Sequence, residues 1–329
     1  MLPVLLLGAA ALGAAPPPPP PRALFRCQPG PGAQGGPPPP PPNATSCVAL
    51  GCRWDGQHCA LRSPFARLLF ADEFDGRAVN GSSWAVWDYR ANMSPGRVRT
   101  NAAHDMVYAA DAVTVSGGAL TITSARHAAP LRVAPNASAH YTTGRLQTQS
   151  RRSWGPYGQF EARARVPRAR GTNNAVWLMP QSFGSGASTY TEFDIAEILG
   201  RDSGTAHGTY HWGAPAGPLH HRSGGEYIDK AGLSEGFHMC DHCPRSNLCS
   251  LAHPIAARSY GIIWTARAIY WYVDDVIYHT CALPANATRP SVFFILQTNI
   301  GSNWAGRPVA SDFPAEMVVD FVRVLGPAD

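Results

Sequence analysis

A short apolar segment that carries three carboxylates constrains this chain more than any other feature. It reads Thr191-Glu192-Phe193-Asp194-Ile195-Ala196-Glu197-Ile198-Leu199. Its β-branched and aromatic residues are typical of a buried or half-buried β-strand. A strand of this kind seldom carries acids, because an unpaired charge is costly to bury. The three acids therefore need an explanation beyond packing.

Strand parity gives the first clue to how the three acids are arranged. Successive strand side chains point to opposite faces, so Glu192 and Asp194 share one face. Glu197 breaks this parity. We predict a β-bulge near Ile195 or Ala196, because one extra residue would return Glu197 to the face of the other two acids.

Three neighbouring carboxylates cannot all be ionised without strong repulsion. We expect one carboxyl to have a raised pKa and to be protonated near neutral pH, while another stays anionic. This division suits glycoside cleavage, in which retaining enzymes separate the two carboxyls by about 5 to 5.5 Å and inverting enzymes by about 6.5 to 9.5 Å. The segment alone is compatible with either spacing. The alternative is that the acids form the exposed polar face of an edge strand.

The rest of the chain predicts an all-β fold. Hydrophobic residues make up 45% of the 329 residues, and the 32 Gly and 31 Pro residues indicate many turns rather than long helices. Short apolar or alternating runs separated by turn residues favour an antiparallel sandwich. The predicted strands are residues 68–70, 113–115, 119–122, 158–166, 175–179, 193–198, 260–264, 269–273, 291–296 and 317–324.

Several features indicate an exported protein. Residues 1–15 have the pattern of a signal peptide, and no later segment is long and apolar enough to cross a bilayer. We expect a monomer that is secreted and lies outside the cell or in the cell wall, without a membrane partner. The net charge of +5 is too mild to predict nucleic-acid binding. Five glycosylation sequons agree with export, at Asn43, Asn80, Asn92, Asn136 and Asn286.

Eight cysteines in an exported chain predict disulfides. Four lie in the first 63 residues and four in the remainder, so we expect pairing within each group and leave the connectivity open. The Cys240-x-x-Cys243 spacing beside histidines is also compatible with zinc, although export favours disulfides. The two groups are Cys27, Cys47, Cys52 and Cys59, and Cys240, Cys243, Cys249 and Cys281.

Composition divides the chain into a small N-terminal segment and a main domain. Residues 16–63 hold two proline tracts and the first cysteine group, which predicts a Pro-rich, disulfide-linked segment. Its role is open between a spacer and a binding module. Residues 64–329 carry the predicted strands and form the predicted catalytic domain.

Several further motifs accompany the acid segment in a fixed order. Residues of about 65 to 326 resemble glycoside hydrolase family 16, and within it the laminarinase-like branch that acts on β-1,3-glucans. The motifs that carry the resemblance are Phe70-Ala71-Asp72-Glu73-Phe74-Asp75-Gly76 with Trp84, Tyr141-Thr142-Thr143-Gly144-Arg145-Leu146, Tyr157-Gly158-Gln159-Phe160-Glu161-Ala162, the acid triplet, and the runs at 260–265, 269–274 and 313–324.

The resemblance implies a β-jelly-roll, a sandwich of two antiparallel sheets with a concave substrate cleft. It implies an endo-acting, retaining hydrolase of β-1,3- or mixed β-1,3/1,4-glucans that works by double displacement. Glu192 would be the nucleophile, Glu197 the acid/base residue and Asp194 the helper that tunes the pair. No cofactor is required and no metal ligand is identified, while a structural calcium, which members of the family often hold, is left open.

The resemblance also assigns substrate-binding residues. Trp177 would stack on a sugar, although it could instead pack in the core, and His211 would lie near the acid/base residue, although it could be structural. Arg145 would bind substrate or neutralise carboxylates. The chain departs from the family at three site positions: Asn173 stands where relatives usually carry an aromatic platform, Thr191 stands for the usual Gly before the first catalytic Glu, and Gln297 stands where many carry Asn.

Three alternatives to the hydrolase remain. A transglycosylase of the same fold would share the covalent intermediate. A non-catalytic glucan-recognition protein is disfavoured because all three acids are present. A structural wall protein anchored by the Pro-rich arm is the third. The insertion from Gly217 to Leu251 has no clear family counterpart, and we expect it to wall the cleft.

Overall fold

The computed structural model describes eleven stretches of the chain. The predicted signal peptide, both proline tracts, Cys240, Cys243, Cys249 and the sequons at Asn43, Asn92 and Asn136 lie outside the described residues. The sequon residues Asn80 and Asn286 are both exposed. The described residues are 24–27, 45, 47, 52–54, 59–91, 98–101, 104–134, 137–184, 190–213, 219–228 and 257–328.

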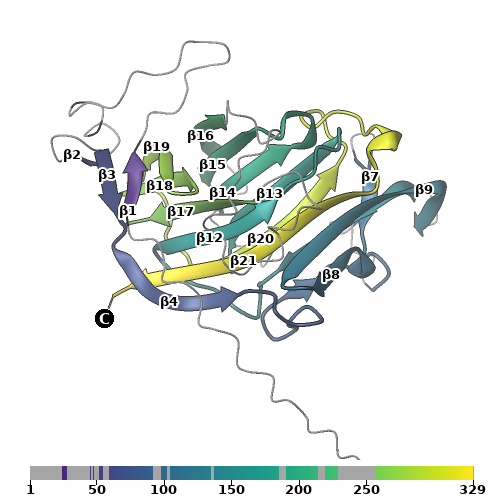
Figure 1. Cartoon of the computed structure of the whole chain (residues 1–329), viewed down its shortest axis with the longest axis horizontal. Helices are drawn as coiled ribbons and strands as arrows, with labels where there is room; N and C mark the ends of the chain where they lie inside the picture. Colours follow the sequence, from purple (N-terminus) through teal and green to yellow (C-terminus); the bar gives the residue numbers. More distant parts are fainter. Residues whose placement is uncertain are drawn as a thin grey trace, which may run out of the picture.

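The fold is a sandwich of two β-sheets, as the sequence predicts (Figure 1). Every predicted strand is present. Three short 3₁₀ helices are described, at Ala110–Ala112, Gly200–Asp202 and Ala310–Asp312. Among the described residues, no helix has the length and apolar character needed to span a membrane.

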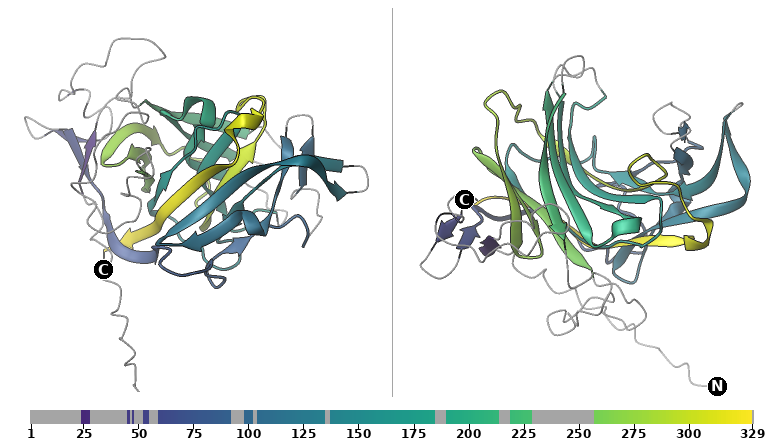
Figure 2. Two further views of the ribbon diagram at one scale, coloured as in Figure 1. Left: turned by 45° about the vertical axis from the view of Figure 1, so that its right-hand side comes forward. Right: turned by 90° about the horizontal axis from the view of Figure 1, so that it is seen from above.

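The smaller sheet has seven strands and is curved (Figure 2). The acid segment forms β14, which lies between two neighbours, so the alternative of an exposed edge strand is wrong. The insertion supplies the edge strand β16. In spatial order the strands are β16 (Leu219–Ile228), β15 (Thr205–Gly213), β14 (Tyr190–Leu199), β13 (Thr172–Pro180), β20 (Val292–Ile300), β11 (Arg145–Gln147) and β5 (Ala85–Val86).

The larger sheet has fourteen strands. Two of its pairings, β1 with β19 and β10 with β7, are parallel rather than antiparallel, and both join segments that no hairpin connects. In order the strands are β2 (Arg53–Trp54), β3 (Cys59–Arg62), β1 (Leu24–Cys27), β19 (Val276–Ala282), β18 (Ala268–Val273), β17 (Arg258–Trp264), β12 (Gly158–Arg165), β21 (Ala315–Pro327), β9 (Ala119–Ala134), β10 (Ala137–Thr143), β7 (His104–Tyr108) and β6 (Val98–Asn101), with β4 (Phe65–Asp72) on β21 and β8 (Val113–Ser116) on β9.

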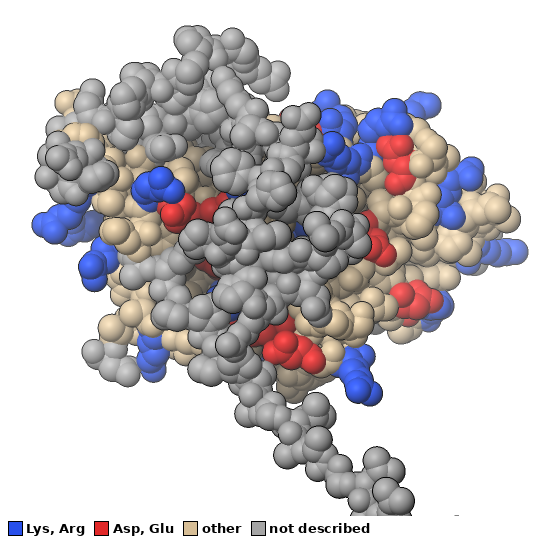
Figure 3. All heavy atoms as spheres, in the orientation of Figure 1, with Lys and Arg blue, Asp and Glu red and all other residues tan. Residues whose placement is uncertain are grey.

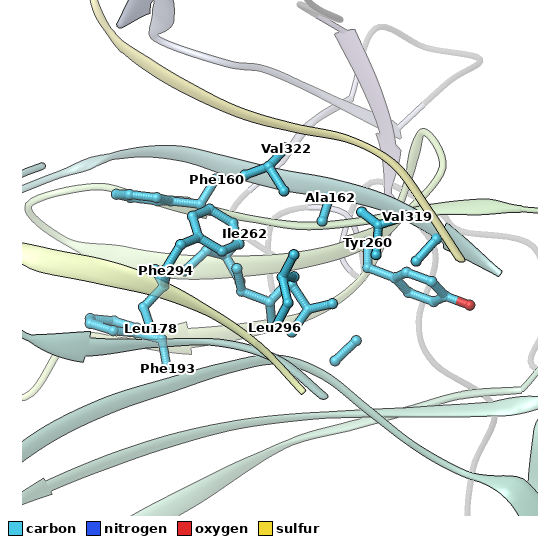
Figure 4. Close-up of a cluster of buried hydrophobic side chains, with 14 of the residues drawn as sticks. Phe160, Ala162, Leu178, Phe193, Tyr260, Ile262, Phe294, Leu296, Val319 and Val322 are labelled. Carbon is cyan, nitrogen blue, oxygen red and sulfur yellow. The ribbon is translucent and has the colours of Figure 1, made fainter. Parts of the chain in front are cut away.

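The main core fills the space between the sheets (Figure 4). Alternate residues of the facing strands supply it: Phe160 from β12, Phe193 from β14 and Phe294 from β20 are all fully buried. The Phe193 ring lies 4.7 Å from that of Trp264 in the opposite sheet. Burying each such side chain contributes about 1.5–3 kcal/mol, so the alternation that fills the core also fixes which residues face away from it.

The described strands of the N-terminal segment, β1 to β3, belong to the larger sheet. Disulfides join Cys27 to Cys52 and Cys47 to Cys59, which selects one of the three connectivities left open and confirms pairing within this group. Strand β1 pairs with β19, and the Phe25 ring packs 4.5 Å from that of Tyr272. The domain boundary after residue 63 stays a prediction, but strands from both sides of it share one sheet.

The predicted bulge lies in the middle of β14. In the pairing with β13, Ala196 faces Val176 and Asp194 faces Trp177, so Ile195 is the extra residue. The pairing with β15 shifts over the same stretch, between Asp194 and Glu197. The bulge is therefore confirmed at one of its two predicted positions.

A tryptophan from the other sheet holds the bulge in place. The Trp271 indole Nε1 donates a 2.9 Å hydrogen bond to the backbone carbonyl of Asp194. Gly208 lies on β15 opposite the bulge, and a Cβ there would lie 2.4 Å from Trp271 Cδ1 and 2.7 Å from Nε1. Glycine at position 208 thus leaves the space that the indole occupies.

We expect Gly208→Ala to destabilise the fold by about 1–3 kcal/mol, because overpacking of this size displaces a buried side chain. Urea unfolding followed by tryptophan fluorescence measures the effect. Gly81→Ala is the matched control, since a Cβ at Gly81 meets no atom within 4 Å. Equal unfolding midpoints for the two variants would show that Trp271 has room to move.

Candidate active site

One face of the smaller sheet, turned away from the main core, carries all three acids. We call it the carboxylate face. The strand register aligns one row of neighbouring residues across this face, from β15 to β11. Next to the acid that β14 contributes, the row has a small alanine from β13. The row consists of His207, Glu197, Ala175, Gln297 and Arg145.

Glu192 and Asp194 share a histidine. His211 Nε2 lies 3.2 Å from Asp194 Oδ2 and 4.0 Å from Glu192 Oε1. Strand register places His211 directly beside Glu192. The Tyr190 hydroxyl donates a hydrogen bond to Glu192 Oε2. Glu192 is thus held by a phenol on its own strand and by an imidazole on the next.

Asp194 is the most deeply buried of the three acids, at 4% exposure. Burial raises its pKa well above the ordinary value of 3.8, and the charges of Glu192 and Glu197 raise it further. A hydrogen bond between Asp194 and Glu192 acts in the same direction. These influences favour the protonated form of Asp194, hydrogen-bonded to Glu192. The expectation of one carboxyl with a raised pKa is confirmed in direction.

Glu197 is subject to opposing influences. Burial raises its pKa, and the charge of Glu192 raises it further. Asn173 Nδ2 donates a 2.9 Å hydrogen bond to Glu197 Oε1, which lowers the pKa, as does the charge of His211. Asn173 thus contacts the predicted acid/base residue directly.

Arg145 and Gln297 bond to each other beside the acids. Arg145 Nη1 donates to Gln297 Oε1 at 3.0 Å, and Nη2 donates to Gln147 Oε1 at 3.0 Å. The guanidinium lies 4.0 Å from the ring centroid of Trp87 and 5.1 Å from that of Trp177. At 3% exposure, Arg145 stabilises the floor of the site and holds Trp177 next to Asp194.

The structure brings all the predicted site residues onto this face and adds others that sequence reasoning missed. Tyr190 could have been found by parity, because it lies two residues before Glu192. Asn299, which accepts a hydrogen bond from the Tyr108 hydroxyl, lies two residues after Gln297. No sequence pattern indicated that Trp87 belongs to the site.

The site also contains a group with metal-ligand geometry. One ligand atom each from Glu192, Asp194 and His211 lies within 4.8 Å of the others. Calcium takes six to eight oxygen ligands, so two carboxylates and an imidazole do not suit it. The only other such group among the described residues consists of disulfide cysteines. A structural calcium elsewhere stays a prediction.

Comparison with known proteins places this geometry in a family. Residues 100–239 match the sequence model of glycosyl hydrolases family 16. The chain is 30% identical over 293 residues to a beta-glucanase of Rhodothermus marinus, covering 84% of this chain and 91% of that enzyme. The chain therefore belongs to family 16 of the glycosyl hydrolases.

Two other similarities extend this result. The chain is 29% identical over 275 residues to glucan endo-1,3-beta-glucosidase A1 of Niallia circulans, spanning 78% of this chain but 37% of that protein. The fold matches the crystal structure of an endo-beta-1,3-glucanase from Pyrococcus furiosus with a TM-score of 0.62 at 25% identity, covering 80% of this chain and 95% of that one.

Removal of the Asn173 amide should shift the pH dependence of activity. The amide stabilises the ionised form of Glu197, so Asn173→Ala should raise the pKa of Glu197 and move the alkaline limb of kcat/KM to higher pH. The pH profile on a soluble β-glucan measures this shift. An acidic limb that stays in place is the internal control, and an unmoved alkaline limb would contradict the assignment of the bond.

Ionisation of Asp194 should lower the stability of the fold as the pH rises. Its folded-state pKa is raised, so the free energy of unfolding falls from about pH 4, the ordinary pKa, towards the raised value. Asparagine is neutral throughout, so Asp194→Asn should gain stability over the wild type between pH 4 and pH 7, measured by urea unfolding.

Asp88 provides a control of opposite sign. Its hydrogen bond from Arg90 lowers its pKa, so Asp88→Asn should lose stability relative to the wild type as pH rises. If both variants changed in the same direction with pH, a general charge effect would explain the data and the protonated state of Asp194 would be rejected.

Proposed function

We propose that this protein is an endo-acting hydrolase of β-1,3- or mixed β-1,3/1,4-glucans that works by double displacement. One observation carries the proposal: the bulge in β14 puts Glu192 and Glu197 on one face, on either side of an Asp194 whose pKa is raised. Two carboxyls in different protonation states are what glycoside cleavage requires.

In the first step Glu192 attacks the anomeric carbon. The glycosidic C–O bond breaks, and Glu197 gives its proton to the leaving oxygen. The raised pKa of Glu197 supports its role as the acid. The Tyr190 hydroxyl and the protonated Asp194 both bond Glu192, so they orient its oxygens before the attack.

In the second step water replaces the sugar on Glu192. Glu197, now ionised, takes a proton from the water as the water oxygen attacks the anomeric carbon, and the ester bond to Glu192 breaks. The negative charge of Glu192 is absent while the ester exists. Since that charge raises the pKa of Glu197, its loss lowers the pKa and suits Glu197 to act as a base.

The substrate class rests on relatives. Besides the three enzymes above, an endo-1,3-1,4-beta-glycanase of Rhizobium meliloti is 26% identical over 265 residues. The partly exposed indole of Trp177, held beside Asp194, offers an apolar surface to the C–H face of a pyranose. The two disulfides support a secreted location, and we propose a monomer acting outside the cell.

Hydrolysis of defined polymers tests the proposal. We expect reducing-sugar release from laminarin or lichenan but not from agarose, with the β-anomer formed first by NMR. Glu197→Gln should lower kcat about 10²- to 10⁴-fold, and Glu192→Gln should abolish turnover. Binding to every polymer without release by the wild type would reject the hydrolase and assign a recognition role.

Azide distinguishes the two glutamates. With an activated aryl glycoside, azide should rescue Glu192→Ala to give the α-glycosyl azide, because it attacks in place of the nucleophile. It should rescue Glu197→Ala to give the β-glycosyl azide, because it attacks the glycosyl-enzyme. The reverse assignment of anomers would exchange the two roles.

A further inference from the structure

Strand β1 has two different faces. Phe25 and Cys27 point inward and are fully buried against Tyr272 and the disulfides, whereas Leu24 is 62% exposed and the Arg26 side chain 69% exposed. This alternation gives the sheet of β1, β2 and β3 an inner face that packs on the protein and an outer face that does not.

Strand register gathers three arginines on the outer face. Ala60 of β3 lies between Arg53 of β2 and Arg26 of β1, and Arg62 pairs with Leu24 in the next row. Neighbouring strands lie about 4.8 Å apart, so Arg53 and Arg26 are about 10 Å apart at their Cα atoms. The small Ala60 side chain leaves the space between them open.

The charge of this face is poorly balanced. Arg26 reaches Asp275 at 3.5 Å, but both side chains are exposed, so the pair is weak. Arg53 and Arg62 are exposed, and neither forms an ion pair with a residue that the structure describes. Residues 1–63 contain four arginines and no lysine, with Asp55 as the one acid.

The arginines lie apart from the carboxylate face. Strands β1–β3 belong to the larger sheet and the three acids to the smaller one (Figure 1). Figure 3 shows arginine side chains along the edge of the molecule that β1–β4 form, at the left of the view. A polymer bound there would leave the acids accessible.

We propose that the outer face of β1–β3, with Arg26, Arg53 and Arg62, is a binding surface for an anionic polysaccharide. Guanidinium groups bind carboxylate and sulfate oxygens through paired hydrogen bonds, and three of them at fixed spacing suit a polymer with repeated charges. The choice of a glycan rests on the proposed function, because a wall or matrix polymer held at this face would raise the local concentration of glucan at the acids.

Binding of the full-length protein to dextran sulfate, alginate and uncharged dextran tests the proposal, at 0.05 and 0.5 M NaCl. We expect the wild type to bind dextran sulfate or alginate at low salt, more weakly at high salt, and to ignore dextran. The double variant Arg53→Gln/Arg62→Gln should bind at least tenfold more weakly.

The double variant Arg126→Gln/Arg168→Gln is the matched control. It removes the same charge from exposed residues outside this face and should bind within twofold of the wild type. Equal loss in both doubles, or no binding by the wild type at 0.05 M NaCl, would overturn the proposal. So would tighter binding of a 20-nucleotide single-stranded DNA, which would make this a nucleic-acid surface.

Hydrolysis and folding are read separately from binding. Both doubles should hydrolyse laminarin at the wild-type rate and unfold at the wild-type temperature, since they alter exposed side chains. Arg53→Lys/Arg62→Lys keeps the charge and should bind more tightly than the glutamine pair. If only the glutamine pair loses binding, the binding surface is supported even if the wild type does not hydrolyse laminarin. A failure of the proposed function can therefore be distinguished from a failure of the proposed surface.

Discussion

The chemistry of this site depends on where one backbone carbonyl is held. The backbone carbonyl of Asp194, at the bulge, accepts a hydrogen bond from Trp271, which reaches across from the other sheet. Loss of that donor would remove a buried hydrogen bond from the carbonyl at the bulge. The bond therefore links the distance between the two sheets to the bulge that puts the three acids on one face. A change in the core behind the site would shift the positions of the acids.

The buried acids oppose the stability of the fold that holds them. Asp194 is buried with two other carboxyls nearby, an arrangement that lowers stability as the groups ionise. The hydrogen bond between Asp194 and Glu192 and the contacts with Tyr190 and His211 offset part of this cost. The core between the sheets, with its buried rings, supplies the remainder. Function and stability oppose each other in this strand.

The local features of this protein could be predicted from its sequence. Period-two alternation located the strands, and the broken parity of Glu197 predicted the bulge, because both depend on neighbouring residues. Sequence reasoning did not reach the contact of Asn173 with Glu197 or of Arg145 with Gln297, since those depend on which strands pair and in which register. Trp87 and Trp271 are likewise placed by distant parts of the chain. The disulfide connectivity could not be predicted from the sequence for the same reason, because it depends on which cysteines the fold brings together.

The pairing of β1 with β19 has a consequence for how the molecule assembles. Arg26 and its neighbour Asp275 are 249 positions apart in the chain, so the first described strand to emerge during synthesis finds its place only after almost all the others exist. Contacts between such distant segments form slowly. Until then the backbone edge of β19 is uncovered, and uncovered edges invite pairing with other chains. The two N-terminal disulfides can close early and hold β1 and β3 together, ready to cover that edge when it appears.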